Sequence, residues 1–271
     1  MGKLSIVATP IGNLEDITLR ALRVLKEADI IACEDTGHSL PLLLKYDIKK
    51  PLLSYWKAKE AQKAEELLFK LEEGKHIALI TDAGMPCISD PGSIIVRLAR
   101  QAGHEIEVVP GACACVSAYA LSGFEGGFSF LGFLPSKKSD RRKFLEKQRD
   151  NPLCSIFYVA PHDYKKDISD IMEVFGDREC AAVREMTKIH EEVVVDKLSV
   201  LVNAEARGEY VLVVKGNENE QASELNELSL EEHVIFYKQQ GLDKKECVKK
   251  VAAERGLVKN DVYQVALKIY E

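Results

Sequence analysis

One short segment of the chain concentrates side chains that could move protons and stabilise charge. Between Glu185 and Glu191 it also carries Lys188 and His190, so acids, a cation and an imidazole fall within a few residues. Carboxylates and imidazoles accept protons, and a positioned ammonium group stabilises an oxygen that gains negative charge. The plainer interpretation is a set of surface ion pairs beside a strand end, which usually contribute little.

A second acidic pair, Glu34 and Asp35, follows the apolar run at residues 30–33. If that run is a strand of a parallel sheet, both carboxylates lie at its carboxyl end, where open α/β sheets bind small molecules. His162 is a further candidate base, although a single histidine more often packs or makes a hydrogen bond.

Residues 81–92, Thr-Asp-Ala-Gly-Met-Pro-Cys-Ile-Ser-Asp-Pro-Gly, have the composition of a ligand-binding turn. They follow an apolar run at residues 77–80, which predicts a buried strand ending at Asp82, and they precede a helical pattern. Ala83 and Gly84 leave room for the backbone to approach a ligand, because glycine has no Cβ. A simple connecting turn is the alternative interpretation.

The composition restricts the class of protein. A chain of 271 residues with 46% hydrophobic residues is long enough for one large domain or two ordinary ones. Its net charge of -6 does not suggest general nucleic-acid binding, so an RNA partner would have to contact local basic patches. No apolar run is long enough to span a bilayer and the N-terminus lacks a signal-peptide layout, so we expect a cytoplasmic protein without a membrane partner.

The cysteines predict no cross-links. The 7 cysteines form no CxxC pair and most lie in apolar runs, which indicates reduced core residues. Cys113, Cys115, His162 and His190 could in principle hold a metal, but their spacing matches no known site, so we predict none.

The first part of the chain alternates strand and helix patterns. Apolar runs at residues 4–8 and 30–33 flank a helix that Asp16 is expected to cap, which is typical of a parallel βαβ unit. Further strands are expected at residues 52–55, 77–81 and 105–109, with helices at residues 58–73 and after Gly92. Ser89 or Asp90 is expected to cap the latter helix, with Pro91 in its first turn.

Three loops follow these strands, at residues 9–13, 82–90 and 110–114. Because parallel strands share one carboxyl edge, we expect the loops to converge on one crevice.

After residue 123 the pattern indicates a second α/β unit. Strands are expected at residues 128–134, 153–159, 180–184, 193–195 and 210–214, helices at 167–175 and 199–207, and a basic loop at 135–142. An acidic segment then reads as a linker, and two amphipathic helices separated by Gly256 follow it. The predicted domains are residues 1–123 and 124–217, a linker at 218–230 and a helical C-terminal appendage at 231–271.

The chain lacks both the GxGxxG fingerprint and a GxxxxGK[ST] loop, which counts against a dinucleotide dehydrogenase and a P-loop nucleotide hydrolase. Four other segments resemble, in order and spacing, the tetrapyrrole methylase superfamily. The resemblance is closest to its ribosomal RNA branch, the small-subunit ribosomal RNA (cytidine-2′-O)-methyltransferases. The segments are residues 7–18, 82–92, 131–135 and 185–192.

The resemblance implies two α/β domains with S-adenosylmethionine in the cleft between them, and usually a homodimer. The implied reaction moves the cofactor's methyl group to the 2′-oxygen of a cytidine in the decoding region of small-subunit ribosomal RNA. The partner would be that RNA or the assembled small subunit. Carried onto this chain, the cofactor-binding residues would be Pro10, Ile11, Asp82, Ala83, Gly84, Met85, Gly111, Cys113, Ala114, Tyr158 and Val183.

The chain departs from the family pattern at several positions. Gly37 replaces an arginine, and a Glu-Ser-Pro-His-Arg motif becomes residues 159–163, Val-Ala-Pro-His-Asp. Residues 85–87 and 110–114 also differ. These changes fall near the expected acceptor side, so they bear on the substrate more than on the cofactor.

With that resemblance, Lys188 is expected to lower the effective pKa of the ribose hydroxyl, while Glu185 or Asp35 orients it or accepts its proton. A basic run would contact RNA phosphates, or else form a solvated helix start. Two other functions stay open, a methyltransferase for a tetrapyrrole or other small molecule and a non-catalytic RNA-binding relative. The basic run consists of Lys137, Lys138, Arg141 and Arg142.

Overall fold

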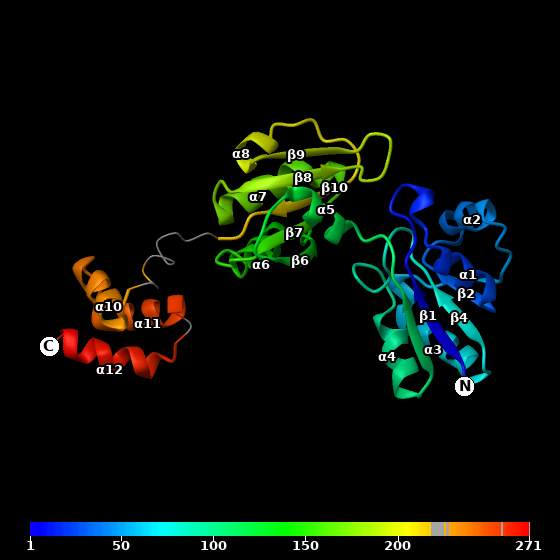
Figure 1. Cartoon of the computed structure of the whole chain (residues 1–271), viewed down its shortest axis with the longest axis horizontal. Coiled ribbons are helices and arrows are strands. Elements are labelled where there is room, and N and C mark those ends of the chain that lie inside the picture. Colours follow the sequence, from blue (N-terminus) through cyan, green and yellow to red (C-terminus); the bar gives the residue numbers. More distant parts are fainter. Residues whose placement is uncertain (218–224, 226–227, 256, 271) are drawn as a thin grey trace. The chain divides into compact units, whose positions relative to one another are not determined.

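The computed structural model describes residues 1–217, 225, 228–255 and 257–270. The chain divides into two compact units, Met1–Gly216 and Asn217–Glu271. The first unit holds two five-stranded sheets with helices, and the second is helical where it is described (Figure 1). The predicted α/β class and the helical appendage are confirmed, whereas the predicted linker falls largely outside the described residues.

The first sheet is parallel and has the strand order β3-β2-β4-β1-β5. Its three central strands are short, mainly apolar runs that helices cover on both faces, as buried parallel strands require. Helices α1 (Leu19–Glu27) and α2 (Thr36–Lys45) pack on one face, and α3 (Glu60–Glu72) and α4 (Ser93–Gln101) on the other. The strands are β1 (Lys3–Val7), β2 (Ile30–Cys33), β3 (Leu52–Ser54), β4 (His76–Leu79) and β5 (Glu105–Val109).

Helix starts in this part differ from the predictions. Thr18 caps α1 by accepting the N–H of Ala21, and Asp16 belongs to a separate short 3-10 turn, η1 (Leu14–Asp16). Gly92 precedes α4 without a side-chain cap, so the expected caps before it remain in the loop. Helix α2 was not predicted because it contains glycine and proline, which are weak helix formers.

The second sheet is mixed, with the order β6-β7-β10-β8-β9. Strands β6 and β7 are parallel, and the other pairs are antiparallel. Helices α6 (Lys138–Glu146), α7 (Tyr164–Phe175) and α8 (Leu198–Leu201) cover one face, and α5 (Ala114–Ser122) covers the other. The strands are β6 (Phe128–Phe133), β7 (Cys154–Val159), β8 (Glu179–Arg184), β9 (Glu192–Lys197) and β10 (Tyr210–Val214).

Three features of this half depart from the sequence interpretation. The predicted basic loop is largely the start of helix α6, and the helix expected at residues 199–207 is reduced to α8. Helix α5 precedes residue 123 but packs against the second sheet, so its contacts group it with residues after that boundary. The short turn η3 (Pro161–Asp163) leads from β7 into α7.

The second unit contains helices α10 (Leu230–Gln239), α11 (Lys244–Arg255) and α12 (Lys259–Tyr270), which share one apolar core. Two helices were predicted here, so α10 is additional, and Gly256 lies outside the described residues. His233 is fully buried, and its Nε2 lies 3.0 Å from Glu254 Oε2. Its Nδ1 accepts a hydrogen bond from Arg255 Nε at 2.9 Å. Among the described residues, no helix is long and apolar enough to cross a membrane.

Candidate functional site

A cleft of about 410 Å³ opens where the strands of the first sheet end. This volume lies in the range of small-molecule sites. The loops after β1, β2, β4 and β5 form one wall, and the second sheet with its loops forms the other. The first wall contains Ile11, Glu34, residues 82–85, residues 88–90, Cys113 and Ala114, and the second contains Phe133, residues 158–161, Val183, Glu185, Met186, Lys188 and residues 209–211.

Backbone hydrogen bonds join two of the loops in the first wall. Thr9 donates its N–H to the carbonyl of Gly84 at 2.9 Å, and Gly84 donates back to Thr9 at 3.1 Å. Gly84 has φ +83°, and a Cβ there would approach Ile11 Cγ2 to 3.2 Å. The expected convergence of the strand-end loops is therefore confirmed, and glycine is needed for its closest point.

A loop of the second wall rests on the first wall at Gly12. The hydroxyl of Thr187 accepts the N–H of Asn13 at 2.9 Å. A Cβ at Gly12 would lie only 2.6 Å from Thr187 Oγ1 and 2.7 Å from Lys188 Cγ. Glu185 and Thr187 both adopt positive φ, 47° and 65°, which is uncommon for residues with side chains. This contact holds the loop that carries Lys188 in one place.

Lys188 lies in the cleft between two carboxylates. Its Nζ is 3.0 Å from Glu185 Oε1 and 3.0 Å from Glu209 Oε2. Burial lowers the pKa of Lys188, but the hydrogen bonds to Glu209 and Glu185 outweigh it and the net pKa is raised. The pKa of Glu185 is lowered, first because it accepts the Glu209 N–H at 2.8 Å. Lys188 is thus a stable cation that can stabilise an oxyanion, and Glu185 is a poor proton acceptor.

Residues 3–202 match the family model described as Tetrapyrrole (Corrin/Porphyrin) Methylases. The chain belongs to the tetrapyrrole methylase family. A relative from Halalkalibacterium halodurans, named Ribosomal RNA small subunit methyltransferase I, is 42% identical over 97% of this chain and 94% of that protein. The protein of the same name from Thermotoga maritima is 45% identical over 80% of this chain and 100% of its own length.

Solved structures share the tetrapyrrole methylase fold. Uroporphyrin-III C-methyltransferase from Thermus thermophilus, complexed with S-adenosyl homocysteine, superposes with a TM-score of 0.59 at 20% identity, covering 79% of this chain and 97% of that one. Diphthine synthase gives 0.60 at 13% identity, covering 79% of this chain and 90% of that one. At these identities the likeness concerns the fold alone.

The cofactor residues that the family resemblance implied can now be located. Most of them line the cleft, while Pro10 and Gly111 do not. Gly111 instead lies against Ala8, the residue after β1, since a Cβ there would come within 2.9 Å of Ala8 Cβ. The glycine-cradled, largely apolar cleft fits a nucleoside cofactor, and the binding roles themselves stay predictions. The lining members are Ile11, Asp82, Ala83, Gly84, Met85, Cys113, Ala114, Tyr158 and Val183.

The strongest candidate bases are Glu34 and Asp90, on the first wall. Burial is the main cause that raises the pKa of each. The neighbouring carboxylates of Asp90 and Asp82 raise the pKa of Glu34 further, and that of Asp82 raises the pKa of Asp90 against a hydrogen bond from Thr81 that lowers it. The hydroxyl of Thr81 donates to Glu34 at 3.3 Å. A raised pKa suits a group that must take up a proton near neutral pH. The sequence interpretation placed Glu34 among several candidates and treated Asp90 only as a helix cap.

Asp35 has a structural position instead. It does not line the cleft, and its Oδ1 accepts the N–H groups of Gly37 at 2.7 Å and His38 at 3.2 Å as the N-cap of α2. Its predicted catalytic role therefore has no geometric support. His162 and His190 also lie outside the cleft lining.

Two cysteines meet at the start of α5. Cys113 Sγ and Cys115 Sγ are 3.5 Å apart, and the hydroxyl of Tyr158 accepts the Cys115 N–H at 3.2 Å. The hydrogen bond from Cys115 lowers the pKa of Cys113. All of the cysteines are free thiols, as predicted, and the described residues contain no cluster of three or more possible metal ligands.

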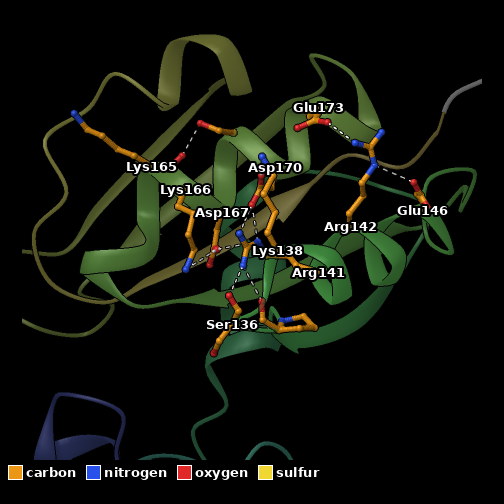
Figure 2. Close-up of polar contacts among 12 residues, drawn as sticks. Ser136, Lys138, Arg141, Arg142, Glu146, Lys165, Lys166, Asp167, Asp170 and Glu173 are labelled. Atoms are coloured by element: carbon orange, nitrogen blue, oxygen red, sulfur yellow. Dashed lines mark hydrogen bonds and ion pairs between the residues drawn. The ribbon is translucent and has the colours of Figure 1, made fainter.

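The predicted RNA contact at Arg141 is wrong. This side chain is buried, and its Nε donates to Asp170 at 2.6 Å while Nη1 donates to the carbonyls of Pro135 and Ser136, each at 2.9 Å. Figure 2 shows the guanidinium enclosed between α6 and α7. Arg141 therefore joins two helices and is unavailable to a phosphate.

Its neighbour Arg142 is exposed but pairs with Glu146 at 3.1 Å and Glu173 at 2.9 Å (Figure 2). Lys138 lies 3.9 Å from Asp170, so its charge is also partly compensated. The run, including Lys137 before α6, stays only a predicted RNA surface, and a weaker one than its sequence suggests.

Proposed function

We propose that this chain transfers a methyl group from S-adenosylmethionine to the 2′-oxygen of a cytidine in the decoding region of small-subunit ribosomal RNA. The observation that carries the proposal is the cleft, in which a fixed cation, Lys188, and two acids of raised pKa, Glu34 and Asp90, lie on opposite walls. Two relatives, 42% and 41% identical over 97% and 98% of this chain, carry the name of a small-subunit ribosomal RNA methyltransferase, which supports the RNA substrate.

The residues of the chain perform three tasks in this reaction. Bound S-adenosylmethionine supplies an electrophilic methyl group on a sulfonium sulfur. The apolar residues Ile11, Ile88 and Val183 exclude water from the cleft. Lys188 stabilises the negative charge that develops on the ribose oxygen, and Glu34 or Asp90 accepts the hydroxyl proton. Because a ribose hydroxyl is a poor nucleophile, holding it in line contributes much of the rate.

We further propose that the chain works as a homodimer on the assembled or partly assembled small subunit in the cytoplasm. Strand β9 supports a dimer because it is a sheet edge with exposed valines at 193, 194 and 195 (37%, 41% and 43%). Antiparallel pairing of two β9 strands about their centres would set Glu192 opposite Lys197 of a second copy. Val194→Lys should then shift the sedimentation coefficient from dimer to monomer, and a dimer unaffected by it would exclude this interface.

Mass mapping of ribosomal RNA tests the function directly. A strain lacking this protein should lose one ribose methyl group on a decoding-region cytidine, and small subunits from that strain should regain it on incubation with the purified protein and S-adenosylmethionine. Unchanged RNA in the deletion strain would refute the substrate. Transfer to a tetrapyrrole by the purified protein, without transfer to subunits, would favour the small-molecule alternative.

A further inference from the structure

The segment that follows β3 lies beside the acidic wall of the cleft. Tyr55 donates its N–H to the carbonyl of Cys33 at 2.8 Å, and Ser54 Oγ donates to the carbonyl of Glu34 at 3.4 Å. Tyr55 itself is buried, and its hydroxyl donates to Glu60 at 3.3 Å. The next residues, 56–59, therefore lie at the rim next to Glu34, which lines the cleft, without lining it themselves.

Trp56 is the only tryptophan of the chain, and it is 42% exposed at this rim. Among the described residues, no ring or cation stacks on its indole. Tryptophan is usually well buried, so an exposed and unstacked indole beside a cleft needs an explanation.

Lys57 and Lys59 belong to the short turn η2 (Lys57–Lys59) beside this indole, and both are exposed. No carboxylate in the described part of the chain lies within ion-pair distance of either ammonium. The charge of Lys57 nevertheless lowers the pKa of Glu34 and of Asp90, both of which line the cleft, so this ammonium group lies near the cleft. This differs from the run at α6, whose arginines are paired.

We propose that Trp56, Lys57 and Lys59 form the surface that contacts RNA next to the methylated nucleotide, with the indole stacked on a base and the lysines on phosphates. Single-stranded nucleic acids are bound in this way, by aromatic platforms combined with cations. The acids of the cleft repel phosphates, so cations at the rim offset that repulsion where the strand enters. The proposal rests on the proposed function and adds the place where its substrate binds.

Fluorescence of the single tryptophan tests the stacking. Titration of the full chain with a single-stranded RNA oligonucleotide should quench and shift the Trp56 emission, since a stacked base alters the environment of the indole. Free tryptophan amide in the same titration corrects for absorption by the RNA. An emission that follows only this correction would overturn the proposal.

Kinetics on small subunits tests the contribution to binding. Trp56→Ala should raise KM about tenfold, within the range of one base stack, while Trp56→Phe keeps most of the affinity. Lys57→Ala with Lys59→Ala should also raise KM and reduce the salt dependence of binding by roughly two phosphate contacts. In both Trp56 variants kcat and the affinity for S-adenosylhomocysteine should stay unchanged, which a merely structural role would not produce. The lysine variant should keep its affinity for S-adenosylhomocysteine, because neither lysine lines the cleft.

The matched control replaces two lysines at the opposite edge of the same sheet. Lys50 and Lys75 precede β3 and β4 at their amino ends, and Lys50→Ala with Lys75→Ala should leave KM unchanged. An equal rise in this control, or no rise in the rim variants, refutes the rim surface while the enzyme still methylates subunits. If the unaltered protein methylates no subunit at all, the proposed function fails instead, and the fluorescence result alone decides whether the rim binds RNA.

Discussion

Replacing Gly12 with alanine tests whether the loop of the second wall must rest on the first. The new Cβ would lie 2.6 Å from Thr187 Oγ1, 2.7 Å from Lys188 Cγ and 2.9 Å from the carbonyl oxygen of Met186. Favourable contacts between heavy atoms begin at about 3.5 Å, so the loop would have to withdraw by roughly 0.6–0.9 Å. One of the close atoms, the carbonyl oxygen of Met186, belongs to the backbone and cannot move aside by a side-chain rotation. The loop must therefore move as a whole, and Lys188 with it.

The expected cost falls mainly on catalysis. Withdrawal of the loop breaks the hydrogen bond from Asn13 to Thr187, which stabilises the fold by about 1 kcal/mol. A displacement of a positioned group by about 1 Å lowers the rate roughly 10²-fold. Gly12→Ala should therefore lower kcat for small-subunit methylation by about 30–100-fold, while the free energy of unfolding falls by only about 1–2 kcal/mol.

Single-turnover transfer of a labelled methyl group and urea unfolding measure the two effects. Gly103→Ala is a suitable control, because Gly103 also has positive φ, +76°, but a Cβ added there would meet no atom within 4 Å. That change should cost about 1 kcal/mol of stability and leave kcat unaltered. A Gly12→Ala protein that keeps kcat within threefold, or that merely matches the Gly103→Ala protein, would refute the reasoning.

Three further changes probe the cleft and the α6–α7 contact. Lys188→Met should lower kcat about 10²-fold with little change in KM, and Lys188→Arg should restore part of it; equal kcat in all forms would exclude oxyanion stabilisation. Arg141→Met removes the buried partner of the half-buried Asp170 and should lower the free energy of unfolding in urea by about 3 kcal/mol, against about 0.5 kcal/mol for the exposed Arg142→Ala; similar costs would contradict the structural role of Arg141. Burial raises the pKa of Asp167 to about 6, so the folded protein holds a proton that the unfolded chain releases. The free energy of unfolding in urea should then fall by up to about 3 kcal/mol as the pH rises from about 4 through 6. Asp167→Asn should remove this dependence of the free energy on pH.

The first sheet was largely predictable because its central strands are buried on both faces. Such strands are mainly apolar, as β1, β2 and β4 are, whereas the edge strand β5 alternates Glu105 and Glu107 with apolar residues. Parallel pairing then brings the loops after β1 and β4 to one edge, as the Thr9–Gly84 contact confirms. Local pattern and topology were enough for the cleft.

The roles of charged residues were less predictable, because a basic run does not reveal which side chains face the core. Arg141 and Leu145 are one helical turn apart on the buried side of α6. There the Arg141 guanidinium donates a hydrogen bond to Asp170 on α7. Asp35 was likewise predicted to be catalytic, but its carboxylate caps helix α2, which begins at the next residue. The role of Arg141 depends on a partner far away in the sequence. The role of Asp35 depends on helix α2, which was not predicted because it contains glycine and proline, residues of low helix propensity.

The backbone of Thr187 has an implication for heat tolerance. A β-branched residue at φ 65° costs roughly 1–2 kcal/mol of stability, so Thr187 makes the native loop less stable than the same loop with a relaxed backbone at this position. A glycine there would relieve that cost but delete the hydroxyl that Asn13 engages. Laboratory selection for thermal stability should therefore favour glycine at position 187, whereas selection for turnover should favour threonine.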